Sequence, residues 1–267
     1  MVESMLENKR DNIEEVYGII CAEQGEIDNL SKDIKDHTET EIASRIFMQG
    51  TLYGRQVVLV LCRPGKVAAS ITATLLIKQF NVDKLLFVGV AGSTHPDVHI
   101  GDIVVGTECS QHDLDVRPFR KQYEVPELGV TFFESALAEK FSEAVSAFLA
   151  GSFKSEFAES NLDMFDITVP TLHKGLIVSG DQFIASKEVK SAIVKGYTEI
   201  HSHTPLACEM EGAAVAQVAY EMGCPALVVR VISDEANDKS LDDFGAFLTK
   251  CSGPVIGAIV REYFFSL

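Results

Sequence analysis

The nine residues at positions 226–234, ALVVRVISD, constrain the fold of this chain more than any other segment. Six of them are apolar and most of these are β-branched, which predicts a buried strand. Arg230 interrupts this run and Asp234 ends it. A buried charge is costly unless it is paired or used, so Arg230 indicates either a structural ion pair or a functional role. Because ligands of open α/β sheets bind beyond the carboxyl ends of the strands, this strand end is a candidate binding site.

Strands and helices alternate along the rest of the chain. The apolar pattern predicts further strands at 16–21, 56–62, 84–90, 103–107 and 174–178. It predicts helices at 67–80, 131–150, 210–222 and 242–264. This alternation is typical of an α/β fold with a largely parallel sheet. No linker divides the sequence, so we expect a polar leader at 1–14 and one domain at 15–267, with a polar surface insertion at 151–172.

Composition narrows the choice of partners. The formal net charge of −16 disfavours a nucleic-acid partner. The six cysteines form no CxxC pair and no zinc spacing, which predicts reduced thiols and no metal site. The pairs His201/His203 and His112/Asp113 lack further ligands at a metal-binding spacing and favour a structural role. Residues 1–14 are too polar for a signal peptide and no apolar run reaches 18 residues, so we expect a cytoplasmic protein without a membrane partner.

Residues capable of chemistry gather where the predicted strands end. They are Glu26 after the first strand, the glycines at 89 and 92, the segment 179–183, the segment 208–212 and finally Ser233 with Asp234. Each has an ordinary explanation when taken alone: Glu26 as a solvated carboxylate, Asp234 as a helix N-cap and Glu211 as a first-turn helix acid. If the strand ends converge, they predict a cavity for a small polar ligand with a flat face.

Seven motifs occur in an order that makes the chain recognisable. They are GIICAEQGE at 18–26, GKVAA at 65–69, GVAG at 89–92, GDIVV at 101–105, SGDQFI at 179–184, EMEG at 209–212 and VRVISD at 229–234. Together they resemble the 5′-methylthioadenosine/S-adenosylhomocysteine nucleosidases of the purine nucleoside phosphorylase superfamily. The resemblance runs from about Val16 to the C-terminus and omits residues 151–172. It implies a single-domain three-layer α/β/α fold with a twisted mixed sheet, adenine release by hydrolysis, no cofactor and a homodimer.

The resemblance also implies roles for individual residues. Asp234 matches the acid that protonates N7 of the leaving adenine, which requires a raised pKa. Glu26 matches the base that orients the attacking water, and Arg230 is expected beside that water, where it would keep Glu26 ionised. Glu211 matches the carboxylate that binds the ribose hydroxyls, while Met210 packs on the sugar.

Further residues match positions that contact the substrate. Phe183 is expected to stack on adenine and the Ile184 backbone to read its edge, while Phe244 covers the ribose. Val116 and Phe119 match the apolar pocket for the 5′ substituent, which Pro126 of a neighbouring subunit would approach. Other expected contacts are Val90, Gly92, Ser233, Pro64 and Glu23.

Three positions depart from the family pattern. Glu23 stands where well-known members have a methionine over the 5′-thioalkyl group, Pro64 replaces an aliphatic residue, and Val90 replaces a serine or threonine. The first two leave the 5′ substituent open, so a nucleosidase for aminodeoxyfutalosine is one alternative. A phosphorylase is another, although no arginine stands in the glycine loops where phosphorylases bind phosphate. A non-catalytic nucleoside-binding protein is a third, which the retained acids disfavour.

Overall fold

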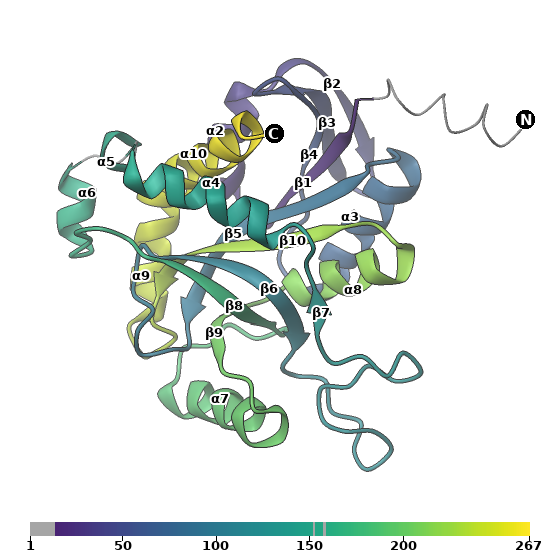
Figure 1. The fold of residues 1–267 in the computed structure, drawn as a ribbon, viewed down its shortest axis with the longest axis vertical. Helices are drawn as coiled ribbons and strands as arrows, with labels where there is room; N and C mark the ends of the chain where they lie inside the picture. Colours follow the sequence, from purple (N-terminus) through teal and green to yellow (C-terminus); the bar gives the residue numbers. More distant parts are fainter. Residues whose placement is uncertain (1–13, 152, 157–158) are drawn as a thin grey trace, which may run out of the picture.

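A computed structural model of the protein describes residues 14–151, 153–156 and 159–267 (Figure 1). The leader predicted at 1–14 lies outside these residues except for Glu14. All six cysteines are free thiols. Within the described ranges, no helix is long and apolar enough to cross a membrane.

A ten-stranded mixed sheet forms the centre of the described chain. Its strands are β1 (Val16–Cys21), β2 (Lys35–Ile42), β3 (Arg45–Leu52), β4 (Arg55–Leu61), β5 (Lys84–Ser93), β6 (Ile103–Gln111), β7 (Phe133–Glu134), β8 (Leu172–Ser179), β9 (Pro205–Glu209) and β10 (Ala226–Asp234). The order is β10-β6-β8-β9-β5-β1-β4-β3-β2, with β7 beside β6. Because β5 also pairs with β10, five of these strands close a ring. The ends of β5, β9 and β10 therefore meet on one side of the sheet.

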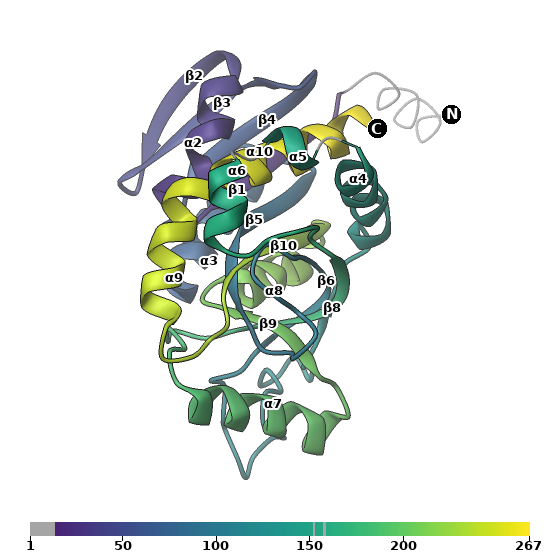
Figure 2. The same cartoon turned by 90° about the vertical axis from the view of Figure 1, so that its left-hand side faces the viewer.

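Helices cover both faces of the sheet, as expected for three layers (Figure 2). They are α2 (Gln24–Asp33), α3 (Lys66–Gln79), α4 (Ala138–Ala150), α5 (Phe153–Glu156), α6 (Glu159–Met164), α7 (Lys187–His201), α8 (Gly212–Met222), α9 (Ser240–Phe247) and α10 (Gly253–Phe265). The helices α2, α4 and α10 share one apolar core, which includes Val88 and Val90 of β5. The helices α3 and α8 share the other, which includes Phe87 and Ala91. The alternation along β5 thus fills both cores, because successive side chains of a strand point to opposite faces.

The predicted strands are confirmed with small shifts at their ends. The strand at 226–234 is β10, and the other five predicted strands correspond to β1, β4, β5, β6 and β8. The helices predicted at 67–80 and 210–222 are α3 and α8. Gly223, the first residue after α8, adopts a left-handed φ of 65°. Glycine takes this conformation without steric cost, and it ends the helix where the sequence predicts.

Other elements differ from the expectation. Glu26, predicted only to follow the first strand, lies in the first turn of α2, a helix that the sequence pattern does not predict. The helix predicted at 131–150 begins only at Ala138, because Phe133 and Glu134 pair with β6. The helix predicted at 242–264 is divided into α9 and α10 by a π-helical turn at Leu248–Ser252. Residues 151–172, predicted as a surface insertion, contain α5, α6 and the buried side chains of Phe153 and Ile167.

Four further elements were not predicted. They are β2, β3, α7 and β9. The strand β2, KDHTETEI, is almost fully exposed at the sheet edge, so it has no apolar alternation to reveal it. Charged residues on such a strand discourage pairing with other chains. The helix α7 has a recognisable N-cap, because Ser186 accepts a hydrogen bond from the Val189 N–H at 3.4 Å.

Candidate active site

One cavity of about 210 Å³ lies where the ends of several elements converge. It is lined by Ala22, Glu23, Glu26, Pro64, Val90, Ala91, Gly92, Gln182, Phe183, Cys208, Glu209, Met210, Glu211, Ser233, Asp234 and Phe244. These residues come from the β1–α2 junction, β5, the segments after β4 and β8, the β9–α8 junction, β10 and α9. The fold therefore brings together most of the residues that the sequence predicts for one site.

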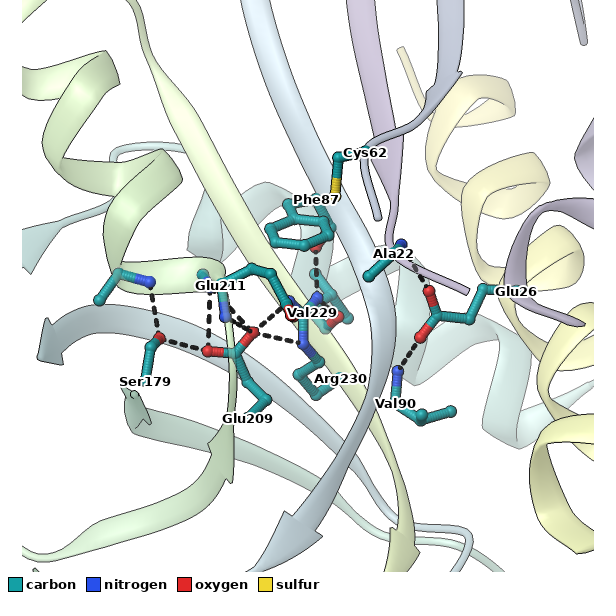
Figure 3. Close-up of polar contacts among 12 residues, drawn as sticks. Ala22, Glu26, Cys62, Phe87, Val90, Ser179, Glu209, Glu211, Val229 and Arg230 are labelled. Carbon is teal, nitrogen blue, oxygen red and sulfur yellow. Dashed lines mark hydrogen bonds and ion pairs between the residues drawn. The ribbon is translucent and has the colours of Figure 1, made fainter. Parts of the chain in front are cut away.

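Glu26 is fixed by three backbone N–H groups, of which Figure 3 shows those of Ala22 and Val90. One carboxylate oxygen accepts from Ala22 at 2.8 Å and from Glu23 at 2.9 Å, and the other accepts from Val90 at 2.9 Å. A Cβ atom at Gly89 would lie 2.6 Å from Glu26 Oε1, so glycine permits this close approach. Burial raises the pKa of Glu26, while the charge of Arg230 and the three N–H groups oppose the rise.

Arg230 is paired with a residue that the sequence analysis did not single out. Its side chain is 1% exposed, and its Nη2 and Nε atoms donate to Glu209 Oε2 at 2.5 Å and 3.2 Å. Nη1 donates to the carbonyls of Phe87 and Val229, and the guanidinium lies 4.1 Å from the centre of the Phe87 ring. Glu209 is thus the direct partner of Arg230, whose charge also acts to lower the pKa of Glu26 against the effect of burial, in the direction that favours an ionised Glu26.

Glu211 lies just before α8 and faces the cavity. The backbone N–H of Gly65 donates to its Oε1 atom at 2.7 Å. Gly65 has a φ of 100°, which favours glycine at this turn. Burial and the nearby charge of Glu209 raise the pKa of Glu211 to about 8. This carboxyl group therefore keeps its proton to a much higher pH than an ordinary glutamate.

Asp234 occupies the carboxyl end of β10 and is 2% exposed. Its Oδ1 atom accepts from the Ala236 N–H at 2.9 Å, and its Oδ2 atom accepts from the Ser233 hydroxyl at 2.9 Å. Burial raises the pKa of Asp234, against the opposing effect of hydrogen bonds from Ser240, Ala236 and Ser233. A Cβ atom at Gly92 would lie 3.0 Å from Oδ1, so this glycine also makes room for a carboxyl group.

Two aromatic rings form an apolar wall of the cavity. Phe183 follows β8 and Phe244 belongs to α9, and their ring centres lie 5.4 Å apart in an edge-to-face arrangement. Phe183 is 43% exposed, which leaves part of its ring free to contact a ligand. A flat heterocycle could bind against such a surface.

Four predicted site residues do not line this cavity within the described chain, and Arg230, buried against Glu209, is one of them. The other three are Ile184, Val116 and Phe119. Ile184 is buried in a separate apolar cluster. Val116 and Phe119 lie on the segment between β6 and β7, which extends away from the sheet at the lower edge of Figure 1. Phe119 is 81% exposed and borders a different surface hollow, together with Pro118 and Ile200. A pocket for the 5′ substituent is therefore not completed by Val116 and Phe119 of the same chain.

The sequence analysis missed the carboxylate that connects the site. Glu209 is buried, and it binds Arg230, Ser179 and the backbone at the start of α8. One signal could have identified it, since a buried arginine in a strand requires a counter-charge and Glu209 precedes the predicted Glu211 by two residues. Its exact partner follows only from the packing of β9 against β5 and of β5 against β10.

Metal ligands are not grouped in the described part of the chain. No set of three or more His, Cys, Asp or Glu side chains there could hold an ion. Asp113 pairs with Lys66 at 2.5 Å, while His203 stacks on Phe132. Asp113 and His203 thus each have a partner within the chain.

Comparisons with known proteins agree with this geometry. The phosphorylase superfamily model matches residues 16–263. A 5′-methylthioadenosine/S-adenosylhomocysteine nucleosidase of Shewanella sp. (strain W3-18-1) is 35% identical over 233 residues, which cover 87% of this chain and 91% of the relative. The solved structure of such a nucleosidase from Neisseria meningitidis, in complex with methylthio-immucillin-A, has a TM-score of 0.82 and 29% identity. The match covers 95% of this chain and 100% of that one.

A second solved structure has a different named activity. The native structure of futalosine hydrolase from Helicobacter pylori strain 26695 has a TM-score of 0.76 and 29% identity. The match covers 95% of this chain and 98% of the futalosine hydrolase chain. The chain described here thus belongs to the phosphorylase superfamily. Within that superfamily it is a member of the 5′-methylthioadenosine/S-adenosylhomocysteine nucleosidase family.

Proposed function

We propose that this protein hydrolyses the N-glycosidic bond of 5′-thio-substituted adenosines, such as 5′-methylthioadenosine and S-adenosylhomocysteine, and releases adenine. The observation that carries the proposal is a cavity lined by two buried carboxyl groups with different neighbours. Burial raises the pKa of both groups. The charge of Arg230 opposes this rise at Glu26, whereas hydrogen bonds oppose it at Asp234 and the charge of Asp243 adds to it. Two carboxyl groups that differ in this way can serve as base and acid at one pH.

Asp234 is the acid in this mechanism. Its buried carboxyl group holds a proton more tightly than an exposed aspartate, because burial disfavours the ionised form. The protonated group donates to N7 of adenine as the glycosidic bond breaks, which neutralises the leaving base. Ser233 donates a hydrogen bond to the other carboxyl oxygen and fixes its orientation.

Glu26 orients and deprotonates the attacking water. Its three backbone donors and the charge of Arg230 favour the ionised form that a base requires. Glu211 accepts hydrogen bonds from the ribose hydroxyls, with Met210 beside the sugar. Phe183 and Phe244 contact the base and the ribose from the apolar wall.

The charges around the cavity favour water over phosphate as the nucleophile. Among the described lining residues, Glu23, Glu26, Glu209, Glu211 and Asp234 carry carboxyl groups, and none is a lysine or an arginine. Arg230 already has Glu209 as its partner. A phosphate ion would meet repulsion here and no unpaired cation, so phosphorolysis is disfavoured.

Glu23 and Pro64 line the cavity and bear on the choice of 5′ substituent. Similarity to a futalosine hydrolase makes aminodeoxyfutalosine the second candidate substrate. The 5′ substituent of that compound carries a carboxylate, which an ionised Glu23 would repel, whereas the homocysteine group of S-adenosylhomocysteine also carries an ammonium that Glu23 can attract. We therefore rank the thio-substituted adenosines first.

The protein acts without a metal or organic cofactor in the cytoplasm, as a homodimer. An exposed apolar side chain supports the dimer, since Phe119 lies on an extended segment beside the basic Arg117, Arg120 and Lys121. Arg117 and Arg120 already form ion pairs within the chain, with Asp115 and with Glu124 and Glu127, so the exposed ring of Phe119 is the feature that supports a second copy as partner. The segment with Phe119 and Pro126 would then approach the 5′ end of the partner's cavity.

Adenine release tests the proposed function directly. The purified protein is assayed with a panel of 5′-substituted adenosines and with aminodeoxyfutalosine, with and without phosphate. We expect turnover of the thio-substituted compounds that does not depend on phosphate. Asp234→Asn and Glu26→Gln should each lower kcat by roughly 10²-fold or more, the usual loss for a general acid or base.

The control variant is Glu139→Gln, whose side chain is 77% exposed and pairs with Lys174 away from the cavity. It should retain the kcat of the unmodified protein. Near-normal turnover by Asp234→Asn would refute its role as the acid. Turnover that requires phosphate would instead identify a phosphorylase, and adenosine binding without adenine release would identify a binding protein.

A further inference from the structure

Glu209 lines the cavity and accepts hydrogen bonds from Ser179, from Arg230 and from the backbone at the start of α8 (Figure 3). We propose that Glu209 is a positioning residue, which holds Arg230, the start of α8 and the segment after β8 in one fixed arrangement. This inference rests on the proposed nucleosidase function and extends it to a residue outside the acid–base pair. Its side chain is 3% exposed, so nearly all its hydrogen bonds must come from the protein.

The protein already occupies the acceptor positions of Glu209. Its Oε1 atom accepts from the Ser179 hydroxyl and from the Gly212 N–H at 2.9 Å. Its Oε2 atom accepts from two Arg230 nitrogens, from the Gly212 N–H at 2.9 Å and from the Glu211 N–H at 3.2 Å. A carboxylate offers about four lone-pair positions. Although Glu209 borders the cavity, no position is left for a ribose hydroxyl, so it orients other groups and does not bind substrate.

The first group that Glu209 orients is Arg230. Two of the guanidinium N–H groups donate to Glu209, and two more donate to the carbonyls of Phe87 and Val229. These four of its five N–H groups, together with the Phe87 ring, fix the plane of the guanidinium. Glu209 supplies the only carboxylate among these described acceptors, and without it Arg230 would be a buried charge with no ion-pair partner.

The second group is the backbone that carries the substrate-binding residues. The N–H groups of Glu211 and Gly212 converge on Glu209, and this places the Glu211 side chain toward the cavity. The Ser179 hydroxyl donates to Glu209 and accepts from the Ala213 N–H at 2.7 Å. Ser179 begins the segment that leads to Phe183, so one carboxylate connects the aromatic wall with the ribose carboxylate.

The charge of Glu209 has an electrostatic consequence for its neighbours. It offsets the charge of Arg230, which would otherwise lower the pKa values of Glu26 and Glu211 further. It also contributes directly to the raised pKa of Glu211. A neutral residue at position 209 should therefore lower the pH at which these carboxyl groups ionise.

The pH dependence of adenine release distinguishes this role from a merely structural one. In Glu209→Gln we expect kcat to fall roughly 10- to 100-fold, because Arg230 and Glu211 lose the partner that positions them, with a smaller change in KM. The acid limb of the kcat/KM profile should move to lower pH by about half a unit or more. Glu209→Asp keeps the charge with a shorter side chain, so kcat should fall while the acid limb keeps its position.

Each outcome has a defined meaning. A higher KM with an unchanged kcat in Glu209→Gln would make Glu209 a substrate-binding residue and overturn the proposal. An unmoved acid limb would do the same. If Glu209→Gln does not fold, Glu209→Asp carries the test, and a normal kcat in that variant would rule the proposal out. If the unmodified protein releases no adenine, the proposed function itself fails, which is a separate result.

Discussion

Individual carboxyl groups in this site experience the same burial but different neighbours. Burial raises the pKa values of Glu26, Glu211 and Asp234. Arg230 opposes this rise at Glu26, whereas Glu209 adds to it at Glu211. Such clusters are unfavourable for stability, because each ionised group has left water. The raised pKa values that result from burial also suit these groups to proton transfer, which is a common property of active sites.

Glu211 should lower the stability of the fold at neutral pH. Its pKa of about 8 in the folded state lies above the usual value. The stability that its proton contributes is thus fully present below the unfolded pKa and is lost as the pH rises toward 8. Glu211→Gln should increase the free energy of unfolding at pH 8 by on the order of 1–3 kcal/mol, and by much less at pH 4. Urea denaturation at both pH values measures this difference.

The same variant should bind nucleosides weakly, because its side-chain amide would replace the carboxylate that accepts hydrogen bonds from the ribose hydroxyls. Glu139→Gln, on the surface, provides the matched control and should change stability little at either pH. Equal unfolding free energies of Glu211→Gln and the unmodified protein at pH 8 would contradict the prediction.

At the scale of elements, the site is made from strand ends and helix starts. The strand β5 contributes Gly89, Val90 and Gly92, which pass close to carboxyl groups from α2 and β10. Such proximity requires the absence of a side chain at the glycines. The pairing of β5 with both β1 and β10 brings these elements to one place.

Gly89→Ala should therefore impair catalysis more than folding. The new Cβ atom would lie 2.6 Å from Glu26 Oε1, so Glu26 must move from its three backbone donors. We expect kcat for adenine release to fall by about tenfold or more, since the base is displaced. Steady-state kinetics together with thermal unfolding measures both effects.

Gly245→Ala is the matched control for this substitution. Gly245 lies in α9, and apart from its chain neighbours and the backbone of its own helix, no atom of the described residues lies within 4 Å of an added Cβ. Alanine is the better helix former, so this variant should be as stable as the unmodified protein or slightly more stable. A Gly89→Ala protein with full activity would show that Glu26 does not need its present position.

At the scale of the whole molecule, the ring of five strands brings residues from distant parts of the chain around one cavity. The Gly65 N–H donates a hydrogen bond to Glu211, which is 146 residues away in the sequence, and the Val90 N–H donates to Glu26, which is 64 residues away. The segment with Phe119, in contrast, extends away from this cavity. A second copy of the chain is the partner that we expect to cover it.

The proposed dimer predicts a mass in solution of about twice 29.2 kDa. Phe119→Asp should weaken it, because the substitution places a charge where an apolar ring would be buried. Sedimentation at several protein concentrations measures the dissociation constant. Val169→Asp, at a side chain that is 61% exposed before β8, is the matched control and should leave the mass unchanged. A monomeric unmodified protein would refute the dimer.

Local sequence patterns determined the α/β class, most of the strands and the set of residues at their ends. These features depend on the period of apolar residues and on glycine positions, which are properties of short segments. The exposed strand β2 was not predicted, because it buries no side chain and so has no apolar alternation. Its absence from the prediction did not affect the site, since β2 lies at the far edge of the sheet.

Only the tertiary structure decided how these residues are paired. A buried arginine needs a counter-charge, so the sequence indicates that Arg230 has an acidic partner. That this partner is Glu209 depends on the register of β10, β5 and β9. The separation of Phe119 from the cavity likewise depends on where a long segment leaves β6. Contacts between residues far apart in the chain follow from packing, and no local pattern encodes them.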